Sequence, residues 1–285
     1  MKKKTIYSGW FLLPALVVFG IFFLLPMVMS LYFSLTVWDF SSFRFVGLEN
    51  FRVFFSERTL SVSVRNTLVY AVLTSGLKVV LAFFIALFLN SKIKSKGFLR
   101  SVIFFPNLVS TIAVGITFRA LMHPSKGLFN TVLGFFGLQG VDWLGNPDIA
   151  LLSIIATDVW KGVGVATVIY IAGLQAIDRS YYEAASIDGA SKWQQVRSIT
   201  LPLVRPAMNS VIILSFVSGM RTFDLIWAMT SGVPTAATNV ISSAIYNQYA
   251  AGFYGLATAG NVVMLVLISV IAFPLQKFLI SREVD

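Results

Sequence analysis

The sequence contains no cysteine and a single histidine, His123. Without cysteine the chain forms no disulfide and offers no thiolate to a metal. One histidine does not furnish a zinc protease site or a serine–histidine triad. The G-x-x-x-x-G-K-S/T motif of a phosphate-binding loop is missing as well. These absences predict a chain without catalytic residues, metal ligands or a nucleotide site of its own.

Charged residues are also scarce. They make up 12% of the 285 residues, whereas a soluble chain carries about 25%. Hydrophobic residues reach 57%, and the mean hydropathy is +0.82, so we expect lipid to solvate much of the chain. The net charge of +10 could suggest nucleic acid, but the Lys and Arg residues form short clusters between apolar runs. That pattern is typical of the cytoplasmic loops of membrane proteins, and we expect no nucleic-acid partner.

Six apolar stretches are long enough to cross a bilayer, which takes about 20 helical residues. They predict an all-α membrane protein with six transmembrane helices near 9–37, 65–90, 101–122, 149–174, 207–230 and 255–277. The first stretch follows three lysines and could be taken for a signal peptide. It is too long for a signal core and no small-residue cleavage site follows it, so we predict a retained helix.

The distribution of basic residues predicts the orientation. With the N-terminus inside, the inner segments carry Lys2, Lys3, Lys4, Lys92, Lys94, Lys96, Arg100, Arg179, Lys192, Arg197, Arg205, Lys277 and Arg282. The outer segments carry Arg44, Arg52, Arg58, Arg65, Arg119 and Lys126, four of them in the first outer loop beside Asp39, Glu49 and Glu57. This bias predicts that both termini are cytoplasmic. The outer loop 123–148 is long enough for a short helix on the membrane surface.

The inner loop 175–206 is longer than a connection between helices requires. Asp178 or Ser180 can cap a short helix that runs through Asp188, and Gly189 can end it with a positive φ. Ser191 can cap a second helix, whose end Pro202 limits. On pattern alone, this helix–glycine–helix unit is either an ordinary amphipathic connector or a surface that another protein approaches closely.

The same loop resembles the EAA signature of ABC importer permeases. Glu183-Ala184-Ala185 is followed after three residues by Gly189, and after nine more by Ile199, one residue, and Leu201-Pro202. In that family the loop is a coupling helix that inserts into a groove of an ATPase subunit, with the glutamate as its acid contact. The coupling residues implied here are Glu183, Ala184, Ala185, Asp188, Gly189, Ile199, Leu201 and Pro202.

Flanking sequences resemble the carbohydrate branch of that family, the maltose-type and glycerol-3-phosphate-type permeases. They are Ile187 to Ser191, Ile199 to Pro202 and Phe223 to Thr230. Phe45 to Phe51 resembles the first of two paired permeases. One departure is Ser231-Gly232-Val233-Pro234, where relatives have a run of glycines before the proline; it bears on the geometry of that outer loop.

The resemblance implies a type I ABC importer transmembrane domain over residues 64–280, preceded by the tail, first helix and first outer loop over residues 1–63. It places the chain in a bacterial cytoplasmic membrane. The implied partners are a second homologous permease subunit, two copies of a P-loop ATPase subunit that hold ATP and magnesium, an extracytoplasmic solute-binding protein and a carbohydrate substrate. The chain itself performs no bond chemistry in that mechanism.

Ionisable residues inside the apolar stretches are costly and tend to face the bundle interior or a cavity. Lys78 lies near the middle of the second stretch. Asp158 and Lys161 are three residues apart, as are Arg221 and Asp224, which predicts one helix face for each pair. We interpret Arg221 and Asp224 as a neutralised structural pair. Lys161 either has such a structural role or meets an acidic or hydroxyl-rich substrate.

Comparison with maltose-type permeases extends the candidates for the substrate pathway. In those relatives the segment around Trp160 and the stretch 215–222 line the transport cavity. The candidates are Trp160, Lys161, Ser218, Gly219, Thr222, Arg221 and Asp224. Trp160, Ser218 and Thr222 suit a sugar ring chemically. Gly219 offers no polar side chain, so the identity of the substrate does not carry over.

Other functions are open at this point. A secondary transporter or channel would suit intramembrane charges, but it leaves the EAA spacing unexplained. An intramembrane enzyme needs a nucleophile–base pair or a metal set that the sequence does not supply. Within the family, the alternative to a sugar permease is a permease for a polyol phosphate or an amino acid.

Overall fold

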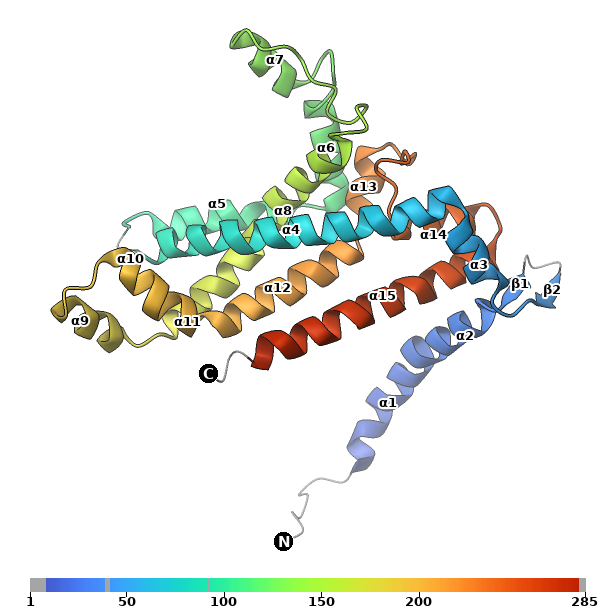
Figure 1. Ribbon diagram of the computed structural model, residues 1–285, viewed down its shortest axis with the longest axis horizontal. Coiled ribbons are helices and arrows are strands. Elements are labelled where there is room, and N and C mark those ends of the chain that lie inside the picture. The colour runs from blue at the N-terminus through green and yellow to red at the C-terminus, as the bar shows by residue number, and fades with distance from the viewer. Residues whose placement is uncertain (1–8, 39–41, 92, 282–285) are drawn as a thin grey trace. The chain divides into compact units, whose positions relative to one another are not determined.

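The computed structural model describes residues 9–38, 42–91 and 93–281, and this part of the chain is helical apart from one short hairpin (Figure 1). Lys2, Lys3, Lys4, Asp39, Lys92 and Arg282, which entered the charge analysis, lie outside the described residues. The chain divides into two compact units, Met1–Ser61 with Ala244–Val266 and Val62–Ser243 with Leu267–Asp285.

The first unit joins an apolar helical segment to a short hairpin and a short helix. Its elements run in the order η1 (Gly9–Leu12), α1 (Leu13–Phe19), η2 (Gly20–Leu24), α2 (Leu25–Phe33), β1 (Thr36–Trp38), β2 (Phe43–Phe45) and α3 (Glu49–Ser56). The strands pair antiparallel with Thr36 opposite Phe45. Asn50 on α3 donates 2.8 Å hydrogen bonds to the carbonyls of Ser34 and Thr36. The amide therefore fixes α3 against the start of the hairpin.

The second unit is built on long helices. Its elements are α4 (Arg58–Asn90, which starts in the first unit), α5 (Lys96–Leu108), α6 (Thr111–Leu121), α7 (Leu128–Phe135), α8 (Ala150–Gln175), α9 (Arg179–Ile187), α10 (Lys192–Gln195), η3 (Val196–Thr200), α11 (Leu201–Leu203), α12 (Arg205–Met220) and α13 (Asp224–Met229). The last helices are α14 (Ile241–Ala250) and α15 (Tyr254–Ser281), each divided between the units. Both α5 and α12 pack on α8, while α13 packs on α6 and α8.

Two apolar clusters hold the second unit together. One joins Tyr70, Val114, Ile154 and Ile226 from α4, α6, α8 and α13. The other gathers small and apolar residues such as Ala82, Tyr170 and Val211 from α4, α8 and α12. Small residues at these contacts let membrane helices approach closely, which is how such helices associate where lipid removes most of the hydrophobic driving force.

The described helices provide between four and six membrane spans. Trp10–Phe33, Arg58–Asn90, Ala150–Gln175 and Tyr254–Ser281 are each long and apolar enough alone. Two further spans exist if a bent pair counts as one: Lys96–Leu108 with Thr111–Leu121, bent by 96°, and Lys192–Leu203 with Arg205–Met220, bent by 67°. Each predicted stretch overlaps one of these six segments.

Two of the predicted stretches are not continuous helices, which corrects the sequence analysis. The stretch 101–122 breaks after Leu108, two residues beyond Pro106, where Val109 and Ser110 adopt extended backbone. The stretch 207–230 ends as a helix at Met220 and resumes at Asp224. Hydropathy averages over a window and does not register such breaks. The second helix also starts at Arg58, seven residues before the predicted bound.

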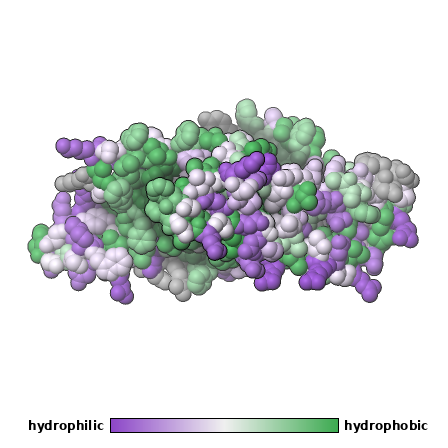
Figure 2. Space-filling model, turned by 90° about the horizontal axis from the view of Figure 1, so that it is seen from above, coloured by the Kyte–Doolittle hydropathy of each residue, from purple (hydrophilic) through white to green (hydrophobic). Residues whose placement is uncertain are grey.

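Apolar residues cover much of the molecular surface, as Figure 2 shows for the face seen from above. Phe22, Phe84 and Phe273 are each more than half exposed. Such a surface is unfavourable in water and suits a chain surrounded by lipid or by other apolar chains.

Candidate functional sites: a capped hairpin and a charged cavity

The loop 175–206 folds as the predicted helix–glycine–helix hairpin. The Oδ1 atom of Asp178 accepts a 2.9 Å hydrogen bond from the Ser180 N–H and caps α9. This backbone hydrogen bond lowers the pKa of Asp178 below its ordinary value, because it stabilises the ionised carboxylate. Gly189 follows α9 with φ +78°, a conformation that L side chains rarely adopt.

The second arm begins with a capping box. Ser191 Oγ accepts from the Gln194 N–H at 3.3 Å, and Gln194 Oε1 accepts from the Ser191 N–H at 2.7 Å. The arm continues through η3 and α11 to Leu203, directly after Pro202. The arms are also tied together, because Gln195 Nε2 donates to Ser186 Oγ at 3.0 Å. Sequence reasoning missed this tie, because it joins residues on separate helices.

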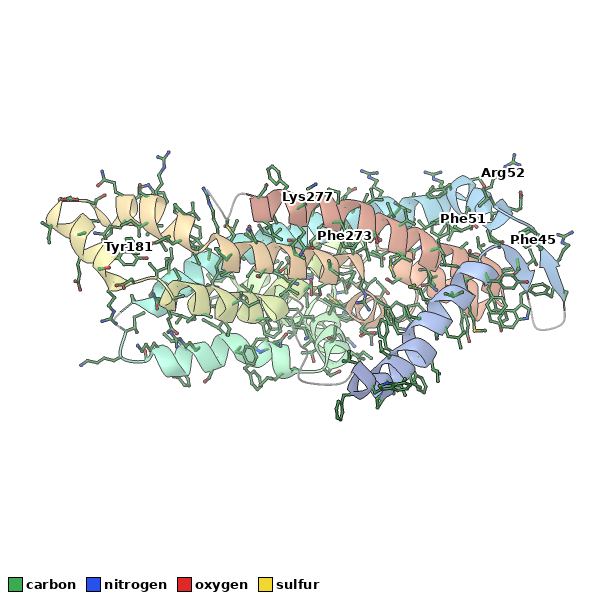
Figure 3. All side chains as sticks on the ribbon, turned by 90° about the horizontal axis from the view of Figure 1, so that it is seen from below. Phe45, Phe51, Arg52, Tyr181, Phe273 and Lys277 are labelled. Atoms are coloured by element: carbon green, nitrogen blue, oxygen red, sulfur yellow. The ribbon has the colours of Figure 1, made fainter. Side chains whose placement is uncertain are left out.

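The apex of the hairpin presents apolar groups beside charge. Glu183, Ala184, Asp188 and Gly189 are exposed, and Ala185 is half-buried. Around them Ile187 is 87% exposed, Trp193 65% and Tyr181 56%. Figure 1 shows α9 and α10 beyond the ends of α4, α8 and α12, and Figure 3 labels Tyr181. Ile199 and Pro202 are half-buried in the second arm, whereas Leu201 is exposed. Exposed apolar side chains around a carboxylate are typical of a protein-binding surface.

A cavity of about 520 Å³ lies in the second unit, within the apolar helices. Its lining includes the predicted residues Lys161, Ser218, Arg221, Thr222 and Asp224, together with Lys78, Asn107, Thr111 and Asp158. Five ionisable side chains thus meet at one cavity in a chain where charge is rare. Two of the predicted residues do not line it. Trp160 packs its ring 4.9 Å from that of Phe118, and Gly219 lies against Ala71.

The ion pair in the cavity is not the one that helix spacing suggested. Lys78 Nζ lies 2.8 Å from Asp158 Oδ2, and among the described residues this is the one salt bridge. The Lys78 side chain is 6% exposed and that of Asp158 22%. The interpretation of Arg221 and Asp224 as a neutralised pair is wrong, because α12 ends at Met220 and the two residues no longer share a helix face.

A glycine makes the ion pair possible. A Cβ atom at Gly162 would lie 2.7 Å from Cε and 2.8 Å from Nζ of Lys78. These distances are shorter than van der Waals contact, so only glycine leaves room for the lysine in this position. The carboxylate is therefore held by the Lys78 amine from α4 while part of it faces the cavity.

Long apolar helices, a charged cavity among them and a structured polar hairpin define a membrane transport component. The chain belongs to the family of binding-protein-dependent transport system inner membrane components, whose signature matches residues 78–284. It is accordingly a multi-pass inner membrane protein with a transport role. The predicted family is confirmed, and this sets aside the secondary transporter and the intramembrane enzyme.

Relatives extend this similarity to nearly the whole chain. The trehalose/maltose transport system permease protein MalF of Thermococcus litoralis is 37% identical over 271 residues, which cover 94% of this chain and 92% of that protein. The multiple sugar-binding transport system permease protein MsmF of Streptococcus mutans is 31% identical over 275 residues, 95% of this chain and 94% of that one. A crystal structure of a bacterial ABC transporter involved in the import of the acidic polysaccharide alginate contains a similar chain, with a TM-score of 0.82, 25% identity, and coverage of 94% and 93%.

Proposed function

We propose that this chain is the transmembrane permease subunit of an ATP-binding-cassette importer that moves a sugar or oligosaccharide into the cytoplasm. The observation that carries the proposal is the exposed, doubly capped hairpin with the EAA motif at its apex. The names of two relatives, which concern trehalose, maltose and multiple sugars, support a carbohydrate. In the arrangement that we propose, the chain has six spans with both termini in the cytoplasm, which would put this hairpin on the inner side.

The hairpin is proposed to couple the membrane helices to an ATPase subunit. Ala184 and Gly189 allow a partner backbone to approach closely, while Glu183 supplies a charge beside them. Ile187 and Trp193 add apolar area that binding would remove from water. The full assembly would hold a second homologous permease, two ATPase subunits with ATP and magnesium, and a solute-binding protein outside.

The cavity is proposed to be part of the substrate pathway. Lys161, Arg221, Ser218 and Thr222 supply donors, and Asp158 and Asp224 supply acceptors. This mixture suits the hydroxyl groups of a sugar. Trp160 and Gly219 lie outside the lining, so we assign them packing roles.

A polyol phosphate is the second candidate substrate. Lys161 and Arg221 line the cavity without an ion-pair partner among the described residues, so the cavity carries three cations against two carboxylates. An excess of positive charge in a low-dielectric site favours a ligand with a negative group. If glycerol 3-phosphate inhibits the uptake of labelled trehalose, the result would favour a polyol phosphate over a neutral sugar as the substrate.

Glu183→Ala tests the coupling role. The complex is reconstituted in proteoliposomes with its ATPase subunits, second permease and solute-binding protein, and uptake of labelled trehalose and maltose is measured. Because the variant removes a charged contact at a protein interface, we expect ATPase co-purification and uptake to fall about tenfold or more.

Glu49→Ala is the matched control, since Glu49 is an exposed glutamate of the first unit. It should leave ATPase co-purification at the wild-type level. Failure of the wild-type chain to bind any P-loop ATPase would contradict the importer assignment, and equal binding by the Glu183→Ala variant would contradict the role of that residue.

A further inference from the structure

Arg100, on the second turn of α5, carries a hydrogen-bond donor without an acceptor among the described residues. The residue is half-buried, and its Nε atom is fully buried and forms no hydrogen bond there. In folded proteins, buried polar atoms nearly always have a partner. This donor therefore points to an acceptor that the described part of the chain does not supply.

The surrounding sequence supplies no negative charge for it. The segment 58–141 contains nine Lys and Arg residues and no Asp or Glu. Three of the nine, Lys94, Lys96 and Arg100, lie at the start of α5, and we call them the inner basic cluster. Lys94 and Lys96 are exposed, and no carboxylate of the described residues forms an ion pair with any of the three. The inner basic cluster thus presents positive charge that is not neutralised within the described chain.

Apolar side chains on the same helix place the inner basic cluster at the edge of the hydrocarbon region. Phe98 is 71% exposed, Val102 50% and Phe105 62%, and their spacing of four and three residues puts them on one side of α5. On another side, Leu99 and Ile103 pack against the apolar cluster formed by α4, α8 and α12. A helix with an exposed apolar side suits lipid chains, so its basic start lies where the chains give way to head groups.

The geometry of the inner basic cluster suits a phosphate group. Lys96 and Arg100 are four residues apart on α5 and therefore lie on one face of the helix. An arginine binds a phosphate through two parallel N–H groups, and a lysine adds a point charge. Figures 1 and 3 show that α5 starts at the end of the long helices from which α9 and α10 extend. The surface proposed for the ATPase subunit therefore lies further out, and α5 is left to the bilayer.

We propose that Arg100 and Lys96, with Lys94 beside them, bind the phosphate of an anionic phospholipid in the leaflet at this end of the helices. In the orientation proposed above, this is the inner leaflet. Charge complementarity selects an anionic lipid over a zwitterionic one. Because Asn107 on the same helix lines the cavity, a lipid held at Arg100 also steadies one wall of that cavity.

The test measures which lipid lies beside Arg100. The fluorophore bimane is attached to Ser101→Cys, a unique thiol at an exposed position next to Arg100. The complete chain is reconstituted in phosphatidylcholine vesicles in which about 25% of the lipid has brominated acyl chains and is either phosphatidylglycerol or phosphatidylcholine. Bromine quenches the fluorophore only at short range. We expect brominated phosphatidylglycerol to quench severalfold more than brominated phosphatidylcholine, and Arg100→Gln to abolish this preference.

Lys277→Gln is the matched control, because it removes one positive charge from an exposed residue of α15 on the same proposed side of the membrane (Figure 3). It should keep the wild-type preference, whereas general attraction between the chain and the membrane would make the two variants behave alike. Arg100→Lys keeps the charge without the planar fork, so its preference should lie between those of wild type and Arg100→Gln.

Equal quenching by both lipids in the wild type, an unchanged preference in Arg100→Gln, or the same loss in Lys277→Gln would overturn the inference. Displacement of brominated phosphatidylglycerol by inorganic phosphate would overturn the choice of a lipid, and loss of ATPase co-purification by Arg100→Gln would show a protein contact instead. Should Arg100→Gln not fold, an unchanged preference in Arg100→Lys decides against the site. The measurement uses no transported solute, so its outcome is independent of the proposed carbohydrate function.

Discussion

Gly162 is the residue on which the geometry of the cavity depends most directly. It stands on α8 one turn after Asp158, and the end of the Lys78 side chain fills the space where a Cβ would be. The sequence shows only a glycine beside Lys161, with no sign that it faces another helix. The lysine that needs this space lies 80 positions from its aspartate, a separation that no local pattern reveals.

Gly162→Ala is expected to displace Lys78 from Asp158. The atoms that must move are the flexible end of a lysine, so folding should change by less than about 1 kcal/mol. Uptake should nevertheless fall severalfold, because the carboxylate loses its anchor. Thermal unfolding of the purified chain and uptake by the reconstituted complex measure the two effects.

Gly76→Ala provides the control on α4, where an added Cβ meets nothing within 4 Å. It should keep wild-type uptake and gain up to about 1 kcal/mol of helix propensity. If Gly162→Ala and Gly76→Ala behave alike, the space at Gly162 has no role in transport.

The spacing of charged residues in the sequence predicts which of them share a helix face, but it does not predict their ion-pair partners. A separation of three residues places Asp158 and Lys161 near one face of a helix, and both indeed line the cavity. The spacing does not say which neighbouring helix supplies a partner. For Arg221 and Asp224 the premise itself failed, because α12 ends at Met220, before both residues, and α13 begins only at Asp224.

At the scale of elements, the hairpin was predictable because its signals are local. Asp178, Gly189 and Ser191 each act within three residues of their own position, through a cap, a positive φ and a capping box. The breaks at 109–110 and 221–223 were not predicted, because the mean hydropathy over a window stays high in both stretches even though Arg221 and Thr222 stand in the second break. Pro106 offered a hint for the first break, but prolines are tolerated inside membrane helices.

Gly189→Ala tests the turn of the hairpin. Its Cβ would meet nothing within 4 Å, so the cost comes from the backbone, about 1–2 kcal/mol for an L residue in this region. The variant should shift α9 relative to α10 and weaken binding of the ATPase subunit about tenfold, measured by titration of the purified components. Asparagine tolerates the same φ better than alanine does, so the Gly189→Asn variant should bind the ATPase subunit more tightly than the alanine variant. Wild-type affinity for both variants would show that the turn is not required for binding.

At the scale of the whole molecule, hydropathy located six segments but did not distinguish a pump from a channel. The EAA spacing at 183–202 made that distinction, because the role that we propose for its residues is a contact with another protein. The substrate could not be inferred in the same way. The cavity that we propose for it is lined by residues of α4, α5, α6, α8, α12 and α13 at once, and their assembly is visible only in three dimensions.

The absence of cysteine makes the orientation directly testable. Ser95 precedes α5 within the basic cluster assigned to the inner side, and Ser125 lies in the loop assigned to the outer side; both are exposed. Single cysteines at these positions report their side of the membrane, because the chain offers no other thiol. In spheroplasts, a membrane-impermeant maleimide should label Ser125→Cys at once and Ser95→Cys only after permeabilisation. The outer location of Ser125 follows only if the bent pair α5–α6 crosses the bilayer once, with its 96° break inside the span. Protection of both cysteines until permeabilisation would mean that this pair returns to the inner side that it entered from, and α8 would then carry the hairpin at 178–203 to the outer side.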